Sequence, residues 1–529
     1  MTIIYQKDSR SGITYAYEAT FMWDKDKKQS RSKRTLVGRL NPDTGDIIPT
    51  DGRMKKERGE PVVKPGVSSS RRFYGATYLL DAIGHKLGLS EDLKTCFPDS
   101  HKQLLSLAYY LILEDKNPLS RFEKWASIHK HPYGKDIPSQ RSSELFAEIT
   151  EENMRQFFRL QGNRRMEQEY WAYDITSISS FSETLRQVQY GYNKEDDRLP
   201  QINLALIFGE QSKLPFYYRK LAGNIPDVKT LRGLLADLDV VGFHKVKLVM
   251  DNGFFSEDNI NALMEEHLKF LISAKTSLSF IRGELNKVYD DFRTFEYYNE
   301  EHELYAITVP GEWTYTQRRP YKKDVLKEKR RVYIHLYYNI DRAAEDQKNF
   351  DRRLIGLRQE LLFGKRVPEH EKLYKKYFIT TASSRGSKVA VNEEAVKHAK
   401  RYYGFFALLS NEKTDAITAL ELYRNKDLAE KAFGDLKERL NLRRALVSSE
   451  KSLDGKLFVE FVALIYLSYL KKQIHEKKLG KDYTLTGILD KLDVIECFEY
   501  PGRVMRVGEV LEKQRQLYID LGIEPPTSS

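Results

Sequence analysis

The sequence predicts an α/β fold in which a mixed sheet flanked by helices is interrupted by a mainly β insertion. Three observations support this. Strand-like and helical segments alternate between residues 168 and 274. Strands rich in Tyr and Phe fill residues 275–400. Helical spacing of apolar residues dominates on either side, in 71–165 and 451–529. The 529-residue chain is 41% hydrophobic, enough to form sizeable cores.

The N-terminal part divides into a β-rich basic region and a helical region. Residues 1–65 are predicted to form short strands joined by turns, with turn-forming residues at 41–46, and 51–70 is predicted to be a linker. Residues 71–165 are predicted to be helical. Two short helices around Pro138 fit either a helix-turn-helix DNA reader or a plain helical bundle, and the motif has no strict signature.

Residues 168–274 carry the alternation that defines the predicted core. The expected elements, in chain order, are strand 170–180, a hairpin of strands 201–208 and 214–221, helix 227–237, strand 245–250, helix 256–268 and strand 269–274. Three strands followed by helix, strand, helix and strand fit an α/β layer fold of the RNase H type.

The rest of the chain is predicted to complete this core around an insertion. Residues 275–400 are predicted to form a mainly β insertion subdomain that also holds a charged helix at 341–362. The core continues at 401–450 with a strand at 403–409 and a helix at 414–440. Residues 451–529 form a helical C-terminal region.

Composition narrows the classes of function. The net charge of +11 at pH 7 favours polyanionic partners such as nucleic acid. The longest apolar run, Leu457–Leu470, is too short to span a membrane, and no signal peptide is predicted. Two distant cysteines exclude a disulfide scaffold and a cysteine zinc site, and the 11 histidines show no metal-binding spacing. Any metal is therefore expected to be Mg²⁺ or Mn²⁺ on carboxylates.

Two aspartates stand at unusual positions on the predicted strands. Asp174 lies within an apolar strand, and Asp251 ends another strand directly before the turn Asn252-Gly253. A carboxylate among buried strand residues is costly unless it is paired or binds metal. Alternatively, Asp174 is a solvated strand-end acid and Asp251 caps the turn that follows it. Two such acids on neighbouring strands favour a joint site.

A third acid, Glu430, lies on the predicted helix 414–440. For one continuous helix, 100° per residue places Tyr423, Lys426, Glu430 and Lys437 on one narrow polar ridge beside the apolar stripe. The simpler interpretation is an i,i+4 ion pair between Lys426 and Glu430 on a solvated helix.

The ridge resembles a family signature. The segment Tyr423–Glu430, with Lys437 seven residues further on, is similar to the Y-x2-R-x3-E-x6-K signature of the insertion-sequence-four superfamily of bacterial DDE transposases. Asp174-Ile175-Thr176 and Asp251-Asn252-Gly253-Phe254 resemble the first and second catalytic strands of that family. Lys426 departs from the signature, which has Arg there, and Lys cannot form a planar bidentate contact.

The resemblance, which extends over about residues 135–470, implies a function. It implies an RNase H-like catalytic core and a DNA transposase that cleaves and joins insertion-sequence ends. It places Asp174, Asp251 and Glu430 in the metal-binding and catalytic triad. Two Mg²⁺ ions per site are expected, with Mn²⁺ as a substitute, to support phosphodiester hydrolysis and strand transfer.

The same resemblance implies the partners. These are double-stranded DNA (terminal inverted repeats and target), with end recognition by residues 1–165, and a second copy of the chain in a paired-end homodimer. No membrane and no small-molecule cofactor are expected, and the location is the bacterial cytoplasm. Expected DNA contacts share a cationic or aromatic side chain and are Tyr423, Lys426, Lys437, Trp313, Arg318, Arg319, Lys322 and Lys323. Trp313 either stacks on a flipped base or is a core residue of a β layer.

Alternative functions remain open at this point. An RNase H-fold nuclease would cut DNA without joining it. An inactive transposase-derived protein would bind DNA without Mg²⁺-dependent nicking. A basic RNA-binding scaffold is disfavoured because no RNA-recognition motif is present.

Overall fold

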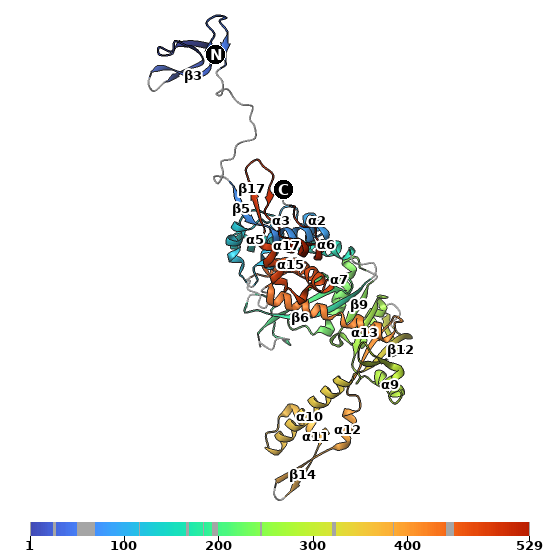
Figure 1. Ribbon diagram of the computed structural model, residues 1–529. Helices are drawn as coiled ribbons and strands as arrows, with labels where there is room; N and C mark the ends of the chain where they lie inside the picture. Colours follow the sequence, from blue (N-terminus) through green and yellow to red (C-terminus); the bar gives the residue numbers. More distant parts are fainter. Residues whose placement is uncertain are drawn as a thin grey trace. The chain divides into compact units, whose positions relative to one another are not determined.

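The computed structural model describes residues 2–24, 28–49, 69–115, 117–164, 169–182, 185–192, 199–243, 246–319, 324–383, 386–440 and 449–527, and Figure 1 traces the chain. Two units emerge. The first comprises Met1–Arg71 and Phe498–Arg506, and the second Arg72–Cys497 and Val507–Ser529. Most of the predicted linker, 51–68, lies outside the described residues. No helix in the described part of the chain is long and apolar enough to cross a membrane.

The first unit contains a four-stranded antiparallel sheet with the order β1-β2-β3-β4. Its strands are β1 (Thr2–Lys7), β2 (Thr14–Asp24), β3 (Gln29–Leu40) and β4 (Ile47–Ile48). The turn expected at 41–46 is present. The Asn41 side chain accepts a hydrogen bond from the Asp43 amide at 3.1 Å, and Gly45 takes the left-handed conformation that closes the turn, with φ of 75°.

A nine-stranded sheet forms the centre of the second unit, with the order β11-β12-β13-β16-β10-β9-β6-β7-β8. Pairs β6–β9 and β9–β10 are parallel and the others antiparallel, so the sheet is mixed, as predicted. The strands are β6 (Tyr170–Ser179), β7 (Gln201–Gly209), β8 (Pro215–Ala222), β9 (Lys247–Met250), β10 (Lys269–Ala274), β11 (Tyr298–Asn299), β12 (Leu304–Arg319), β13 (Asp324–Tyr338) and β16 (Phe405–Ser410).

Helices cover both faces of this sheet. On β9 and β10, Val249 and Leu271 belong to one apolar cluster with helix α13 (Ala416–Arg424). Their sequence neighbours Leu248 and Phe270 belong to the main core, which includes helix α8 (Glu257–Glu265). Alternate strand residues point to opposite faces. Both faces of these strands are buried, which explains why their sequences are continuous apolar runs.

A helical layer adjoins the sheet and is organised around α15 (Glu450–Glu476). Figure 1 shows α15 beside α3 and α5, with which it packs. The other helices of the layer are α1 (Gly75–Lys86), α2 (Leu89–Cys96), α3 (His101–Leu113), α4 (Phe122–Ile128), α5 (Ser139–Glu148), α6 (Glu151–Asn163), α16 (Leu485–Asp493) and α17 (Glu512–Asp520). Leu457–Leu470 is buried throughout, which is why this helix is apolar all round.

The predicted helical regions 71–165 and 451–529 therefore share one core. α5 packs on α15, and α6 packs on α2, α7 (Leu231–Val241) and β8. Phe157 and Phe158 of α6 are buried in this core. This packing corresponds to the helical-bundle alternative for α5 and α6.

Residues 275–400 differ from the expected mainly β subdomain. Strands β12 and β13 are part of the central sheet, since β13 pairs with β16 over Tyr333–Tyr338. After Asn339 the chain is mainly helical. The elements after Asn339 are α10 (Ile340–Leu362), α11 (Glu371–Tyr377), β14 (Phe378–Ser383), β15 (Gly386–Val391) and α12 (Glu393–Lys400), and a further helix, α9 (Ser279–Val288), lies between β10 and β11. The Asn339 side chain accepts a hydrogen bond from the Arg342 amide at 2.8 Å, and this cap starts α10 where the strand ends.

Three short strands make up a further sheet, with the order β18-β17-β5. They are β5 (Ser70–Phe73), β17 (Glu496–Glu499) and β18 (Arg506–Val507).

The crossing of α5 and α15 predicts the effect of a glycine substitution. A Cβ atom at Gly455 would lie 2.1 Å from the Phe146 carbonyl oxygen, so Gly455→Ala must push the helices apart. We expect a loss of about 1–3 kcal/mol in the free energy of unfolding, measured by denaturant titration. Gly356→Ala in α10, where a Cβ meets nothing within 4 Å, is the control and should gain about 0.5–1 kcal/mol. Equal effects of the two would contradict the close approach.

A buried acid in α15 predicts a pH dependence of stability. Glu460 is 0% exposed and its side-chain oxygens have no hydrogen-bond partner, with the Lys456 ammonium 3.8 Å away. Burial raises the pKa of Glu460 from 4.5 to about 8, despite attraction from Lys456. The unfolded chain releases this proton near its ordinary pKa, so this group's contribution to stability falls as the pH rises between these two values.

Glu460→Gln should therefore stabilise the protein at pH 8 by an amount on the order of a few kcal/mol, and by little at pH 4.5. Thermal melts of both proteins at the two pH values measure this. Glu476→Gln, an exposed site on the same helix, is the control and should show no such difference. A Glu460→Gln variant with the pH profile of the wild type would argue against a protonated carboxyl.

Candidate active site

The two predicted aspartates lie on neighbouring strands, Asp174 within β6 and Asp251 directly after the end of β9. β6 and β9 pair in parallel with Tyr173 opposite Met250, so the next residues in register are Asp174 and Asp251. Neighbouring strands are about 4.8 Å apart, and opposite residues of a parallel pair point to the same face. That face is the one covered by α13, because Asp251 follows Val249 at a spacing of two.

Asp174 is buried, with 8% of its surface exposed. Its Oδ1 accepts a hydrogen bond from the Ile175 amide at 2.8 Å. It is therefore not the solvated acid of the alternative interpretation. Burial of a carboxylate beside a second carboxylate requires compensating positive charge.

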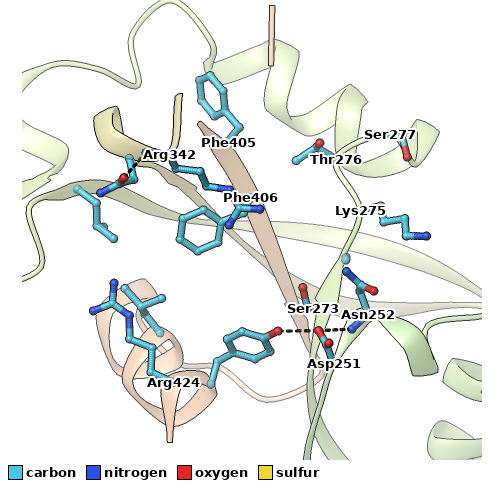
Figure 2. Close-up of a pocket in the computed structure, with 15 residues that line it drawn as sticks. Asp251, Asn252, Ser273, Lys275, Thr276, Ser277, Arg342, Phe405, Phe406 and Arg424 are labelled. Carbon is cyan, nitrogen blue, oxygen red and sulfur yellow. Dashed lines mark hydrogen bonds between the residues drawn. The ribbon is translucent and has the colours of Figure 1, made fainter. Parts of the chain in front are cut away.

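Asp251 caps the turn that follows it and also contacts α13. Its Oδ1 accepts a hydrogen bond from the Asn252 amide at 2.7 Å and so caps the short helical turn that follows. The Tyr423 hydroxyl donates a second hydrogen bond to the same atom at 2.8 Å, and Figure 2 draws both bonds. Burial, with the charge of Asp251, raises the pKa of Tyr423 far above its ordinary value, so the phenol stays a donor.

The predicted helix 414–440 is not continuous, and this corrects the calculated ridge. α13 ends at Arg424, α14 spans Asp427–Gly434, and a π-helix follows over Asp435–Arg439. The Asp415 side chain caps α13 by accepting hydrogen bonds from two amides. Because a π-helix closes i→i+5 bonds, the 100° spacing does not carry on to Lys437. Tyr423, Lys426 and Glu430 come from two helices and the junction between them.

Lys426 sits at this junction and links the three acids. Its ammonium is 2.9 Å from Glu430 Oε1, and the residue is only 6% exposed. Burial by itself lowers the pKa of Lys426, but the hydrogen bond to Glu430 and the charges of Asp251, Glu430 and Asp174 outweigh it and raise the pKa. The i,i+4 ion pair is therefore present, and it also belongs to a wider cluster of one cation and three carboxylates. Glu430 itself keeps 58% of its side chain exposed.

The donor set of this cluster suits a hard divalent cation. Asp174, Asp251 and Glu430 offer carboxylate oxygens, the ligands that Mg²⁺ and Mn²⁺ prefer. In the structure, however, the ligand atoms of these three acids do not all lie within 4.8 Å of one another. Within the described ranges, that distance is met by Glu301, His302 and Glu421. For one ion to engage Asp174, Asp251 and Glu430 together, the three carboxylates have to come closer to one another than they lie in this structure.

The Glu301 group is a poor metal site. Arg424 lies 3.0 Å from His302 Nδ1, and Glu421 lies 3.3 Å from His302 Nε2. Since a guanidinium can only donate, Nδ1 accepts and Nε2 carries the proton, which leaves no nitrogen lone pair for a metal.

A cavity of about 680 Å³ opens beside Asp251 (Figure 2). Lys275, Arg342 and Arg424 give it positive charge, and Phe405 and Phe406 give it aromatic surface. The Arg342 guanidinium lies over the Phe406 ring at 4.9 Å. The sequence reasoning did not single out these cations. Arg424 lies inside the signature and Lys275 directly follows β10, but Arg342 carries no local signal.

The other expected DNA contacts lie elsewhere. Trp313 is 8% exposed, donates a hydrogen bond to Asn261 at 2.9 Å and packs against Phe255 and Phe280, which corresponds to its core alternative. Arg318 is exposed near the end of the β12–β13 hairpin, where Arg319 pairs with Asp324. Lys437 is half-buried in the π-helix. Lys322 and Lys323 lie outside the described residues.

Removing the central cation should expose the repulsion among the acids. We expect Lys426→Met to lower the free energy of unfolding, though by less than the about 3–5 kcal/mol of a fully buried pair, because Glu430 is exposed. Added Mg²⁺ should raise the melting temperature of this variant more than that of the wild type. Melts with EDTA and with Mg²⁺ measure this. Lys431→Met, an exposed lysine of α14, is the control, and an equal Mg²⁺ response in both variants would count against the cluster.

Comparison with known proteins identifies the family of the chain. A family model described as the Transposase DDE domain matches residues 155–466. A cryo-EM structure of a piggyBac transposase synaptic complex with hairpin DNA is similar at 9% identity and a TM-score of 0.34, over 75% of this chain and 73% of that chain. A TM-score of that size supports no conclusion about this chain. No curated protein matches. Because the family model covers more than half of the chain and includes Asp174, Asp251 and Glu430, the protein belongs to the Transposase DDE domain family and is a DDE transposase, a polynucleotidyl transferase.

Proposed function

We propose that this transposase cleaves and joins the ends of an insertion sequence at Asp174, Asp251 and Glu430, and that it belongs to the insertion-sequence-four group. The observation that carries the proposal is the cluster itself. Two aspartates are paired by strand register, and the buried Lys426 ammonium donates a hydrogen bond to Glu430 and lies within the electrostatic influence of both aspartates. The signature residues Tyr423 and Lys426 both contact this cluster.

The three carboxylates would hold Mg²⁺, two ions per site, with Mn²⁺ as a substitute. When bound, such ions neutralise the phosphate charge, activate the attacking hydroxyl and stabilise the leaving oxygen. The chain's own residues then act around them. Tyr423 and the Asn252 amide both donate to Asp251 Oδ1, so this carboxylate is held in one orientation. Outer hydrogen bonds of this kind typically change metal affinity or activity by about 10–100-fold.

Lys426 would change partner during the reaction. In the structure its ammonium neutralises the acids. Once a divalent ion carries that role, the same ammonium is free to contact a phosphate oxygen beside Glu430. Lys supplies a point charge there and no bidentate fork.

Double-stranded DNA is the proposed substrate, as terminal inverted repeats and target, bound by a homodimer that pairs two ends in the bacterial cytoplasm. The excess of Lys and Arg supports an anionic partner. Backbone contacts are proposed for Lys437, Arg318, Arg319, Lys322 and Lys323. End recognition is proposed for residues 1–165, and the core is proposed to be RNase H-like.

Substitution of the acids tests the function. Asp174→Ala, Asp251→Ala and Glu430→Ala should each lower Mg²⁺-dependent cleavage of a plasmid carrying the element ends by about three orders of magnitude or more. Glu438→Ala, an exposed acid of the π-helix, is the matched control and should cleave normally. A triad variant that cleaves at the wild-type rate would refute the assignment.

The same assay separates the alternative functions. Joined products in a target plasmid indicate transposition. Cleavage without joining would indicate a nuclease, and DNA binding without nicking would indicate an inactive derivative.

A further inference from the structure

Three hollows of the second unit are connected by shared residues. The first is the cavity of about 680 Å³ beside Asp251. The second, of about 320 Å³, lies where α14, the π-helix and α15 meet the β7–β8 turn. The third, of about 570 Å³, lies at the C-terminal end of α15. Arg424 lines the first and second, and Lys471 and His475 line the second and third. The three hollows are therefore neighbours, in a series that begins at the candidate active site.

Positively charged side chains outnumber acidic ones in the lining of the three hollows taken together. Three Lys and Arg residues line the first hollow, four more line the second and three more the third, whereas the only acids among the described lining residues are Asp251, Asp427 and Asp435. Asp435 is already paired with Lys471 at 2.6 Å. The surface beyond Asp251 is thus strongly cationic. We call the part formed by Arg424, Lys431, Lys471, His475, Lys478 and Lys481 the basic track.

Some of these cations also hold the fold together. Lys471 pairs with Asp435, and Lys472 donates to the carbonyl oxygens of Gln211 and Ser212 at 3.4 and 3.2 Å. These contacts tie α15 to the π-helix and to the β7–β8 turn. Lys431, Lys478 and Lys481 are exposed instead. The exposed lysines are available to an external anion, and the bonded Lys471 and Lys472 are held in place by the fold.

We propose that the basic track binds the phosphate backbone of duplex DNA that extends from the cleavage site. The match is one of charge. Duplex DNA presents a regular row of phosphates. Lysines that are spread along a surface can each contact a different phosphate of such a row, whereas a single small anion would engage few of them. The second and third hollows offer no aromatic platform beyond Phe208, so the contact is to backbone and independent of base sequence. That the bound polyanion is DNA rests on the proposed function.

The salt dependence of DNA binding tests the track. The variant combines Lys431→Gln, Lys478→Gln and Lys481→Gln, which keep polar side chains and leave the anchored Lys471 and Lys472 intact. The probe is a 40-base-pair duplex of arbitrary sequence, titrated at several salt concentrations without Mg²⁺. The slope of log K against log salt is negative, and each lost phosphate contact makes it shallower by about 0.9. The slope of the triple variant should therefore be shallower than that of the wild type by about 2.7.

A matched variant controls for the loss of net charge. Lys365→Gln, Lys372→Gln and Lys375→Gln remove three exposed lysines near α10 and α11 and should leave the slope unchanged. An unaltered slope in the track variant, or an equal loss in the control, would overturn the proposal.

Failure of the track is distinguishable from failure of the proposed function. A wrong track leaves Mg²⁺-dependent cleavage sensitive to Asp174→Ala while the salt slope stays at the wild-type value. A wrong catalytic assignment leaves cleavage insensitive to Asp174→Ala whatever the slope. Thermal melts of both lysine variants should match the wild type, since the substituted side chains are exposed.

Discussion

The parallel pairing of β6 with β9 is the constraint on which the site depends. It places two carboxylates side by side at one strand end, on a face covered by α13. This arrangement of Asp174 and Asp251 is energetically costly, because two negative charges at strand spacing repel each other and Asp174 is buried. The arrangement therefore needs a cation, and the structure supplies the Lys426 ammonium. The site that we propose as catalytic is therefore also a source of local instability.

The break between α13 and α14 makes that compensation possible. α13 packs over β9 and β10 and brings Tyr423 to Asp251, whereas α14 packs over β6 and β7 and brings Glu430 to the same region. Lys426 at the junction bonds Glu430, and the charges of the acids on both strands raise its pKa. A change in the angle between the two helices would alter all of these contacts together.

α15 gives the site a rigid support at a distance. Its buried length joins helices from both ends of the chain and contacts β8 and the π-helix. Its C-terminal end also carries Lys471 and His475 of the basic track. One helix thus connects the hydrophobic core to the surface that we propose for DNA, so the position of that surface relative to the acids is set by core packing.

Local sequence was sufficient for features that depend on nearby residues. Periodicity and turn chemistry predict Asp174 within one strand, Asp251 at the end of another, the Lys426–Glu430 pair and the alternation of elements in 168–274, and the structure agrees. The family signature added the link between Glu430 and the aspartates. These features depend on spacing along one segment, which the sequence states directly.

Tertiary structure alone decided what depends on distant pairing. The addition of β12 and β13 to the central sheet, the burial of Trp313 against Phe255 and Phe280, and the approach of Arg342 to Phe406 join segments far apart in the chain. The break at Lys426 belongs here too, since helical propensity continues across it and only packing on different strands divides it. Periodicity describes which side of an element is buried. It does not contain the partner that buries it, and that partner positions the cations around the three acids.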